Sequence, residues 1–444
     1  MSKRQRKARL PDQPVRVTIE SLAHDGRGVA RVEGKTVFVD GALPGEEVSF
    51  LYTRRARKHD EGRVSELHTV SPHRVEPKCE GFAICGGCSL QHLAPEQQIL
   101  AKQQTLLDNL QRIGKVQPER VLDPLTGPVW GYRNKARLGV KYVRKKGRVL
   151  VGFREKRAPY LADIARCEVL HAAVGPRFAE LAELIQGLQA RERIAQIEVA
   201  VGDEAAVLVF RNLDPLSAAD SQALVDYGTR TGLHIYLQPG GPDSIELLWP
   251  QRSELYYRLA EHDVTLHFLP IDFTQVNPAI NPPMIRQALE LLELQPQHRV
   301  LDLFCGLGNF TLPMARRAAQ VTGVEGDTGL VQRACDNAVA NGLTNVDYHA
   351  VDLAGDVLHQ PWMRPSYDRI LLDPPRSGAA GMMELLGRMR PGRIVYVSCH
   401  PGSLARDAGR LVNEYGYELK AAGVMDMFPH TSHVESIALF DAGR

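Results

Sequence analysis

The chain has 444 residues, enough for about three domains of ordinary size. Hydrophobic residues make up 44% of the sequence and charged residues 24%, which is typical of a globular protein. No run approaches the roughly 18 apolar residues of a membrane span, and the basic amino terminus lacks the apolar core of a signal peptide. The seven cysteines are an odd number without the spacing of a disulfide framework. We therefore expect a cytoplasmic protein with no membrane partner.

The net charge of +2 conceals a strong segregation along the chain. Residues 131–166 contain 12 Lys/Arg and 2 Asp/Glu, whereas residues 167–444 contain 22 Lys/Arg and 34 Asp/Glu. A basic run is often only a solvated face, but segregation of this size favours a polyanion as the partner, and nucleic acid is the obvious polyanion. We therefore expect the first two-fifths of the chain to bind nucleic acid.

Residues 12–68 are predicted to form a small β-barrel. Segments rich in β-branched and aromatic residues at 15–19, 36–39 and 48–52 are separated by glycine-containing turns. Short strands at this spacing are typical of an OB-like barrel, which often binds single-stranded RNA, although they also fit a generic small β-module. Residues 1–11 precede this domain as a basic, flexible arm.

A cysteine-rich loop at residues 79–92 is followed by a predicted helix. The helix begins at Pro95 and ends before Gly114, the usual asymmetry of helix ends. Its apolar stripe consists of Ile99, Leu106, Leu107, Leu110 and Ile113. Residues 131–270 are predicted to be β-rich. From about residue 284 helices alternate with apolar strands, which is the signature of a parallel α/β sheet.

The first strand of this alternating region ends in a turn that carries Gly306 and Gly308. Glycines at this turn let the backbone approach a ligand, and Glu325, at the end of the next strand, suits the hydroxyls of a ribose. Thr311 stands where a dinucleotide-binding fold has its third glycine, so the turn favours S-adenosylmethionine, which has no phosphate to cradle. Asp352 follows the third strand and could accept a hydrogen bond from the adenine amine. The alternative is an ordinary turn of a doubly wound sheet.

Two later strand ends carry unusual motifs. One strand runs into Asp-Pro-Pro-Arg, which begins at Asp373, and the next runs into Ser-Cys-His-Pro, which contains Cys399. Ligands of open α/β sheets bind outside the carboxyl ends of the strands, so both motifs are expected to face the cofactor crevice. Arg376 replaces the aromatic residue that follows Asp-Pro-Pro in amino-group methyltransferases, which counts against nitrogen methylation.

Cys399 suggests methylation at carbon-5 of uracil. A thiolate that adds to carbon-6 makes an enolate, whose carbon-5 can attack a sulfonium methyl group. A base must then remove the carbon-5 proton, and Glu435, just before the final strand, is the candidate. The alternative for Cys399 is a buried structural cysteine. His430 and His433 lack further ligands nearby and are interpreted as structural or substrate-facing rather than metal-binding.

A second cluster of cysteines has metal-ligand spacing. Cys79, Cys85 and Cys88 lie in a glycine-rich loop, and the nearest later cysteine is Cys167. Four thiolates suit either zinc or a 4Fe–4S cluster. Structural zinc sites usually have two Cys-x-x-Cys pairs, whereas this arrangement is three plus one. The residues alone leave zinc and the iron–sulfur cluster open.

The chain resembles the RNA uracil-C5 methyltransferases along almost its whole length, and most closely their 23S ribosomal RNA branch with an amino-terminal TRAM domain. The resemblance implies an α/β fold, with a Rossmann-like S-adenosylmethionine-dependent methyltransferase domain, an OB-like TRAM barrel and a β-rich central iron–sulfur domain. It implies that Cys399 is the nucleophile and Glu435 the general base. The implied S-adenosylmethionine contacts are Gln275, Phe304, Asn309, Glu325, Asp352 and Asp373. The implied ligands of a 4Fe–4S cluster are Cys79, Cys85, Cys88 and Cys167.

The domains expected from this resemblance are the barrel at 12–70, the central domain at 71–270, whose helix at 95–114 can pack on the catalytic domain, and the methyltransferase domain at 271–444. The expected partner is 23S ribosomal RNA, with no DNA, and the expected state is a monomer. The family's Ser-Cys-Asn-Pro motif is Ser-Cys-His-Pro here. We expect His400 to be tolerated because the thiol and the proline are retained.

Two other functions stay open. One is a uracil-C5 methyltransferase that acts on transfer RNA or on a different ribosomal uridine. The other is an RNA-binding ribosome assembly factor without activity. Such a factor would be expected to lose Cys399, Glu435 or the glycines of the cofactor turn, and none of these is lost.

Overall fold

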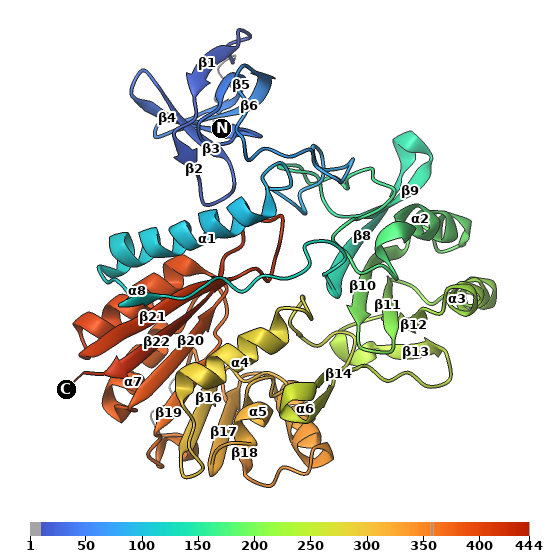
Figure 1. The fold of residues 1–444 in the computed structure, drawn as a ribbon. Helices are drawn as coiled ribbons and strands as arrows, with labels where there is room; N and C mark the ends of the chain where they lie inside the picture. The colour runs from blue at the N-terminus through green and yellow to red at the C-terminus, as the bar shows by residue number, and fades with distance from the viewer. Residues whose placement is uncertain (1–9, 356, 358, 444) are drawn as a thin grey trace, which may run out of the picture.

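The computed structural model describes residues 10–355, 357 and 359–443, so the basic arm predicted at the amino terminus lies almost entirely outside the described residues. Figure 1 shows a small amino-terminal sheet above a long helix, a central domain beside them, and a large carboxyl-terminal sheet below. No helix in these described ranges is long and apolar enough to cross a bilayer.

The amino-terminal domain is a six-stranded sheet with the strand order β1-β5-β6-β4-β3-β2. Its strands are β1 (Val15–Thr18), β2 (Ser21–Leu22), β3 (Gly28–Val32), β4 (Lys35–Asp40), β5 (Glu47–Arg55) and β6 (Asp60–Leu67). All three strands predicted in this region are present. Alternate residues bury a core of its own, including Val37, Val39 and Phe50. Gly62 is needed beside this core because a Cβ there would lie 2.2 Å from the Phe50 ring.

The central domain is a second six-stranded sheet with the order β13-β12-β11-β10-β8-β9. Its strands are β8 (Lys135–Val143), β9 (Arg148–Gly152), β10 (Ile194–Val201), β11 (Ala206–Asn212), β12 (His234–Leu237) and β13 (Glu246–Trp249). The β-rich prediction for this region was incomplete, because helices α2 (Phe178–Gly187) and α3 (Ala218–Thr231) also belong to it. Helix α2 buries Phe178, Leu181 and Ile185 in the same core as the sheet, at helical spacing.

The carboxyl-terminal sheet has eight strands in the order β18-β17-β16-β19-β20-β22-β21-β7. They are β7 (Arg120–Val121), β16 (Arg299–Leu303), β17 (Gln320–Glu325), β18 (Val346–Ala350), β19 (Arg369–Leu372), β20 (Arg393–Ser398), β21 (Tyr417–Met425) and β22 (Glu435–Ala442). The strands from β18 to β20 are parallel, whereas β22 runs antiparallel to both β20 and β21. The sequence analysis missed β7, which lies far upstream of this domain and adds an edge strand to it.

Both faces of this sheet are covered. Along β20, Ile394 and Tyr396 belong to one buried cluster and Val395 and Val397 to the other, because successive side chains of a strand point to opposite faces. The covering helices are α4 (Asn281–Leu292), α5 (Thr311–Ala315), α6 (Thr328–Ala340), α7 (Met383–Met389) and α8 (Pro401–Asn413). The hairpin β14 (Tyr256–Leu259) and β15 (Val264–His267) contributes to the same core.

Helix α1 (Pro95–Asn109) starts where the sequence predicted and packs on α8 and β21, as Figure 1 shows. The turn that follows α1 contacts α8 backbone to backbone, because a Cβ on Gly114 would lie 2.4 Å from the Ala405 carbonyl oxygen. The predicted apolar stripe is correct for Ile99, Leu106 and Leu110, which are buried, but wrong for Ile113, which is half exposed. The helix changes to a π-turn over Leu110–Gly114, and this change of period turns Ile113 outward.

Strand β16 is the point at which the chain reverses direction across the sheet. The chain runs outward from β16 to β17 and β18, and then crosses back to β19 and β20 on the other side. Ligands of doubly wound sheets bind outside the carboxyl ends of the strands at such a switch point. The topology therefore places a binding site between the ends of β16 and β19.

Candidate active site

A cavity of about 640 Å³ lies at this switch point. It is large enough for a ligand of cofactor size. All eight residues that the sequence analysis assigned to the cofactor and to catalysis line it: Gln275, Phe304, Asn309, Glu325, Asp352, Asp373, Cys399 and Glu435. Residues that are separated by as many as 160 positions in the chain, 275 to 435, thus meet in one place.

The turn after β16 has an unusual backbone. Phe304, Gly306 and Gly308 all have positive φ, at 64°, 54° and 92°. Glycine adopts this conformation freely, whereas Phe304 is held in it by hydrogen bonds to strand β17. At Gly308 space is also limiting, because a Cβ would lie 2.8 Å from the hydroxyl of Tyr348. The turn therefore exposes backbone toward the cavity, as the sequence predicted.

The carboxylate of Glu325 is fixed from two sides. One oxygen accepts a hydrogen bond from the backbone N–H of Gly306 at 3.1 Å. The other accepts from the N–H groups of Gly326 at 2.7 Å and Asp327 at 3.1 Å. This carboxylate thus links the ends of the first two strands, and its position is set by the backbone rather than by other side chains.

Asn309 is oriented by two residues that the sequence analysis missed. Its side-chain oxygen accepts hydrogen bonds from the hydroxyl of Tyr257 and from the amide of Asn281, both at 3.0 Å. Its amide donates to the side-chain oxygen of Asn281 at 2.8 Å. Tyr257 lies in β14 and Asn281 at the start of α4, so no local pattern around Asn309 could have indicated them.

Three acidic side chains lie near the strand ends at the cavity: Asp302 and Glu435 are buried, and Asp373 is half-buried. Burial raises the pKa of Asp373 to about 7 and that of Asp302 to about 8. Burial, followed by the nearby charge of Asp373, raises the pKa of Glu435 to about 8. Only 4% of Glu435 is exposed. A cationic ligand would stabilise the charged forms of these acids.

Cys399 lies directly after β20 and is half-buried. The antiparallel pairing of β20 with β22 sets Ser398 opposite Ser436, so the next pair of positions is Cys399 and Glu435. Burial is the main cause that raises the pKa of the Cys399 thiol to about 11, and the charges of Glu435 and Asp373 add to it. Sheet register therefore brings together the two groups that the sequence analysis assigned to catalysis.

Arg376 and His433 form a polar pair at the cavity. The guanidinium Nη2 of Arg376 donates to Nδ1 of His433 at 2.6 Å. Burial and the Arg376 charge lower the pKa of His433 to about 4, so the ring is neutral near pH 7. His430 is buried and stacks on Trp130, with the ring centroids 3.9 Å apart. His433 lines the cavity and His430 does not.

The structure explains why histidine replaces asparagine in the Ser-Cys-His-Pro motif. His400 is the N-cap of α8, and its Nδ1 accepts a hydrogen bond from the backbone N–H of Ser403 at 3.1 Å. Asparagine is a favoured N-cap because its side-chain oxygen accepts this same bond. A neutral His400 ring supplies the same acceptor, so the substitution preserves the cap.

The four clustered cysteines line a second, smaller cavity in the central domain. The backbone N–H of Gly87 donates to the sulfur of Cys85 at 3.4 Å. Burial raises the pKa of Cys88 to about 12 and that of Cys167 to about 11. In the part of the chain that the structure describes, no three or more His, Cys, Asp or Glu side chains are arranged so that they could hold a metal ion.

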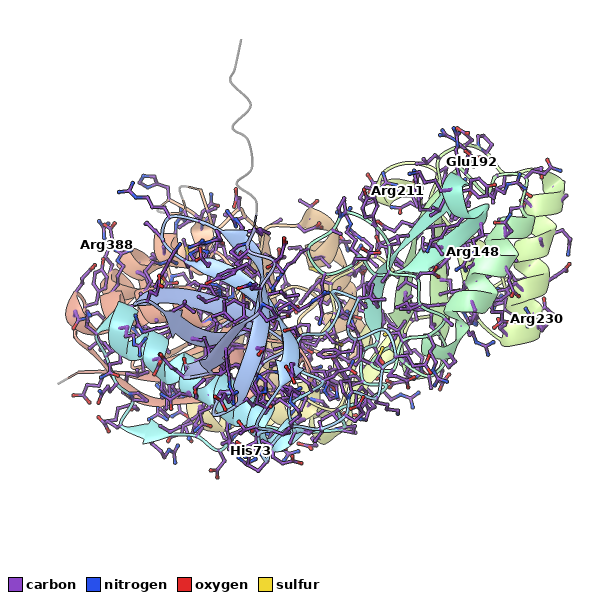
Figure 2. All side chains as sticks on the ribbon, turned by 90° about the horizontal axis from the view of Figure 1, so that it is seen from above. His73, Arg148, Glu192, Arg211, Arg230 and Arg388 are labelled. Carbon is purple, nitrogen blue, oxygen red and sulfur yellow. The ribbon has the colours of Figure 1, made fainter. Side chains whose placement is uncertain are left out.

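The basic turn predicted between β8 and β9 lies on the central domain. Figure 2 places Arg148 there, on the part of the molecule that also carries Arg211 and Arg230. Lys146 and Arg148 both pair with Asp163 at 2.6 Å, so this carboxylate offsets part of their charge. Neither residue lines the cavity at the switch point.

The doubly wound sheet with this cavity at its switch point defines the class of S-adenosylmethionine-dependent methyltransferases. Its fold is similar to the crystal structure of Pyrococcus abyssi tRNA (uracil-54, C5)-methyltransferase in complex with S-adenosyl-L-homocysteine, with a TM-score of 0.74 and 25% identity, covering 96% of this chain and 100% of that chain. The family model tRNA (Uracil-5-)-methyltransferase matches residues 207–442, and the TRAM domain model matches residues 10–49. The chain belongs to the tRNA (uracil-5-)-methyltransferase family, and the predicted family and TRAM domain are confirmed.

Two relatives are similar along their full length. The 23S rRNA (uracil(1939)-C(5))-methyltransferase RlmD of Alcanivorax borkumensis is 55% identical, with 98% of each chain covered. The protein of the same name from Methylococcus capsulatus is 54% identical, with 99% of this chain and 100% of the relative covered.

The environment of Cys399 predicts a thiol that is weakly reactive near neutral pH. A pKa of about 11 in the free protein leaves only a small thiolate fraction at pH 7. The rate of alkylation by iodoacetamide should therefore rise by about tenfold per pH unit between pH 7 and pH 10, because the thiolate is the reactive form. Mass spectrometry of the peptide that contains Cys399 measures this rate. A plateau near pH 9, as for an ordinary exposed thiol, would contradict the proposed environment.

Proposed function

We propose that this protein methylates carbon-5 of uracil 1939 in 23S ribosomal RNA, the reaction in the names of its full-length relatives. The observation that carries the proposal is the placement of Cys399 beside Glu435 in the cavity that also contains the turn after β16. An RNA-binding assembly factor without activity has no need of this combination.

The chemistry assigned to the chain's own residues has three parts. Cys399 loses its thiol proton to solvent, and its thiolate adds to carbon-6 of uracil while the 5,6 double bond opens to an enolate, which makes carbon-5 nucleophilic. S-adenosylmethionine would supply the methyl group to which carbon-5 bonds, and S-adenosylhomocysteine would leave as the bond between the sulfonium sulfur and the methyl group breaks. The carboxylate of Glu435 then takes the proton from carbon-5, and the bond between sulfur and carbon-6 breaks to release the product. Burial raises the pKa of Glu435 to about 8 in the ligand-free protein, so the group is largely protonated near pH 7, and a bound sulfonium cation would favour the carboxylate form that accepts the proton.

The residues around the turn after β16 fit the cofactor. Glu325 is proposed to bind the ribose hydroxyls, since its carboxylate is fixed by backbone N–H groups and lines the cavity. Asp352 is proposed to accept from the adenine amine. The remaining proposed contacts are Gln275, Phe304, Asn309 and Asp373. Gln275 donates to Asp373 at 3.4 Å, which links the loop before α4 to the end of β19.

The amino-terminal and central domains are proposed to bind the RNA. A polar groove of about 530 Å³ lies between them and is lined by Arg27, Arg154, Lys156 and Arg157, together with acidic residues. Arginine and lysine side chains in a groove are the usual partners of RNA phosphates. Action on a uridine of transfer RNA is the second candidate, favoured by the archaeal structure of similar fold. The full-length identity to the ribosomal enzymes favours the first.

The variant Glu435→Gln tests the assignment of the base. Bond formation by Cys399 and methyl transfer do not need Glu435, so a covalent protein–RNA adduct should accumulate while turnover falls by at least about 100-fold, in line with the loss of a general base. The measurement is denaturing gel electrophoresis with a 23S RNA fragment that contains uridine 1939.

Two controls make that experiment specific. The double variant Cys399→Ala/Glu435→Gln should form no adduct, because it lacks the sulfur that makes the bond. A transfer RNA transcript should yield less adduct than the ribosomal fragment. Normal turnover by Glu435→Gln with no slow-migrating species would contradict the proposed mechanism, and adduct formation on transfer RNA alone would favour the second candidate.

The second cavity is proposed to hold a 4Fe–4S cluster. Its lining brings together Cys79, Cys85, Cys88 and Cys167, the four thiols such a cluster requires. The hydrogen bond from Gly87 to the sulfur of Cys85 is typical of cluster ligands, because it stabilises negative charge on sulfur. Zinc is the alternative metal for four thiolates.

Metal analysis distinguishes a 4Fe–4S cluster from zinc. Protein purified without oxygen should be brown and contain about four irons per chain. Replacement of Cys88 or Cys167 with alanine should remove the visible absorbance and the iron. Cys335, which lies in α6 away from this cavity, provides the control, because Cys335→Ala should retain both. One zinc per chain with no visible absorbance would reverse the assignment.

A further inference from the structure

The connection between β21 and β22, which we call the connecting segment (residues 426–434), has no helix or strand of its own. It carries Phe428 and His433 to the cavity and ends at Glu435, the first residue of β22. Its backbone is also strained, because His430 has a φ of 63°, which a residue with a side chain rarely adopts. Contacts from outside the segment must therefore hold it in place.

Gln98 of α1 provides the central contact. Its side-chain oxygen accepts a hydrogen bond from the backbone N–H of His430 at 2.8 Å. Its amide donates to the carbonyl oxygens of Leu90 at 3.0 Å and Leu93 at 2.7 Å. The N–H groups of Ser89 and Leu90 both donate to the carbonyl oxygen of His430 at 2.9 Å. Gln98 is fully buried, so it joins the loop after Cys88 to the connecting segment without solvent between them.

Two further side chains hold the segment from the same side. Lys102, one turn after Gln98, donates to the carboxylate of Asp426 at 2.7 Å and to the carbonyl oxygen of Phe428 at 2.9 Å. Tyr132, which precedes β8, donates from its hydroxyl to the carbonyl oxygen of Pro429 at 3.0 Å. The segment that leads into Glu435 is thus bound by residues more than 290 positions upstream of it.

We propose that Gln98 and Tyr132 are positioning residues for the methyl-transfer reaction. They hold the connecting segment so that the carboxylate of Glu435 lies within reach of the proton on carbon-5 of uracil. The proposal rests on the role of Glu435 given above. Neither residue lines the cavity, so both act through the segment rather than on the RNA or the cofactor. Because Ser89 follows Cys88 directly, the same contacts connect the cysteine loop to the catalytic base.

The test compares Gln98→Leu with Gln104→Leu, the same substitution at an exposed position of the same helix. Gln98→Leu should lower kcat by at least tenfold and raise the fraction of covalent protein–RNA adduct at steady state, because removal of the proton becomes the slow step. The affinity for S-adenosylhomocysteine should stay within twofold. Gln104→Leu should match the unmodified protein in all three measurements.

Tyr132→Phe keeps the test decisive if Gln98→Leu does not fold, because it removes one hydroxyl and preserves the packing. It should lower kcat by about threefold, the effect of one lost hydrogen bond of under 1 kcal/mol, and raise the adduct in the same direction. Lys102 is not suitable as a test, since its removal would leave a buried, unpaired carboxylate at Asp426.

Tryptophan fluorescence reports on the segment itself. Trp130 stacks on His430 with the ring planes at 27°, so release of the segment in Gln98→Leu should change the emission, and the change should be absent in a Trp130→Phe background. The proposal is overturned if folded Gln98→Leu or Tyr132→Phe turns over normally without extra adduct while Glu435→Gln traps adduct. If Glu435→Gln accumulates no covalent adduct, the proposed role of Glu435 as the base is wrong.

Discussion

The antiparallel pairing of β22 with β20 is the constraint on which the site depends. The other strands of this sheet next to the cavity, β16, β17, β19 and β20, are parallel, and their carboxyl ends reach the switch point in the ordinary way of a doubly wound sheet. Strand β22 runs the opposite way, so its amino end meets the carboxyl end of β20. This reversal is what sets Glu435 beside Cys399, and a parallel strand at this position would place its first residue at the far edge of the sheet.

Because of the same reversal, the connection into β22 depends on contacts with other elements. The connection into β22 must pass over the ligand-binding edge of the sheet, where it can pair with no neighbouring strand. Helix α1 and the cysteine loop meet this need by hydrogen-bonding to its backbone at His430 and Phe428. The domain that carries the cysteines is therefore joined by hydrogen bonds to the edge of the sheet at the cavity, although it lies far from that edge in the sequence.

The cofactor turn and the reactive strand ends were predictable from the sequence because each is a local pattern. Glycines after an apolar strand, an acid at the next strand end, and Cys399 after a third strand all follow one rule about the edges of parallel sheets. The structure brings these residues into one cavity as expected. His400 also kept a local role, since an N-cap is decided by the first turn of its own helix.

The residues that the sequence did not indicate all contact residues that are distant from them along the chain. Gln98 and Tyr132 contact the connecting segment, and Tyr257 orients Asn309, but each contact depends on how separate elements pack. From the sequence of an amphipathic helix alone, a buried glutamine cannot be distinguished from an exposed one, because both are polar residues in the same periodic pattern. Strand β7 was missed for a similar reason, because two residues are too few to show a period and only pairing with β21 defines them.

The most direct test of the account is to map 5-methyluridine in 23S ribosomal RNA from cells that lack this protein. The account predicts that uridine 1939 loses its methyl group, that the unmodified protein restores it, and that the Cys399→Ala variant does not. Retained methylation of that uridine in the deleted strain, or restoration by Cys399→Ala, would contradict it.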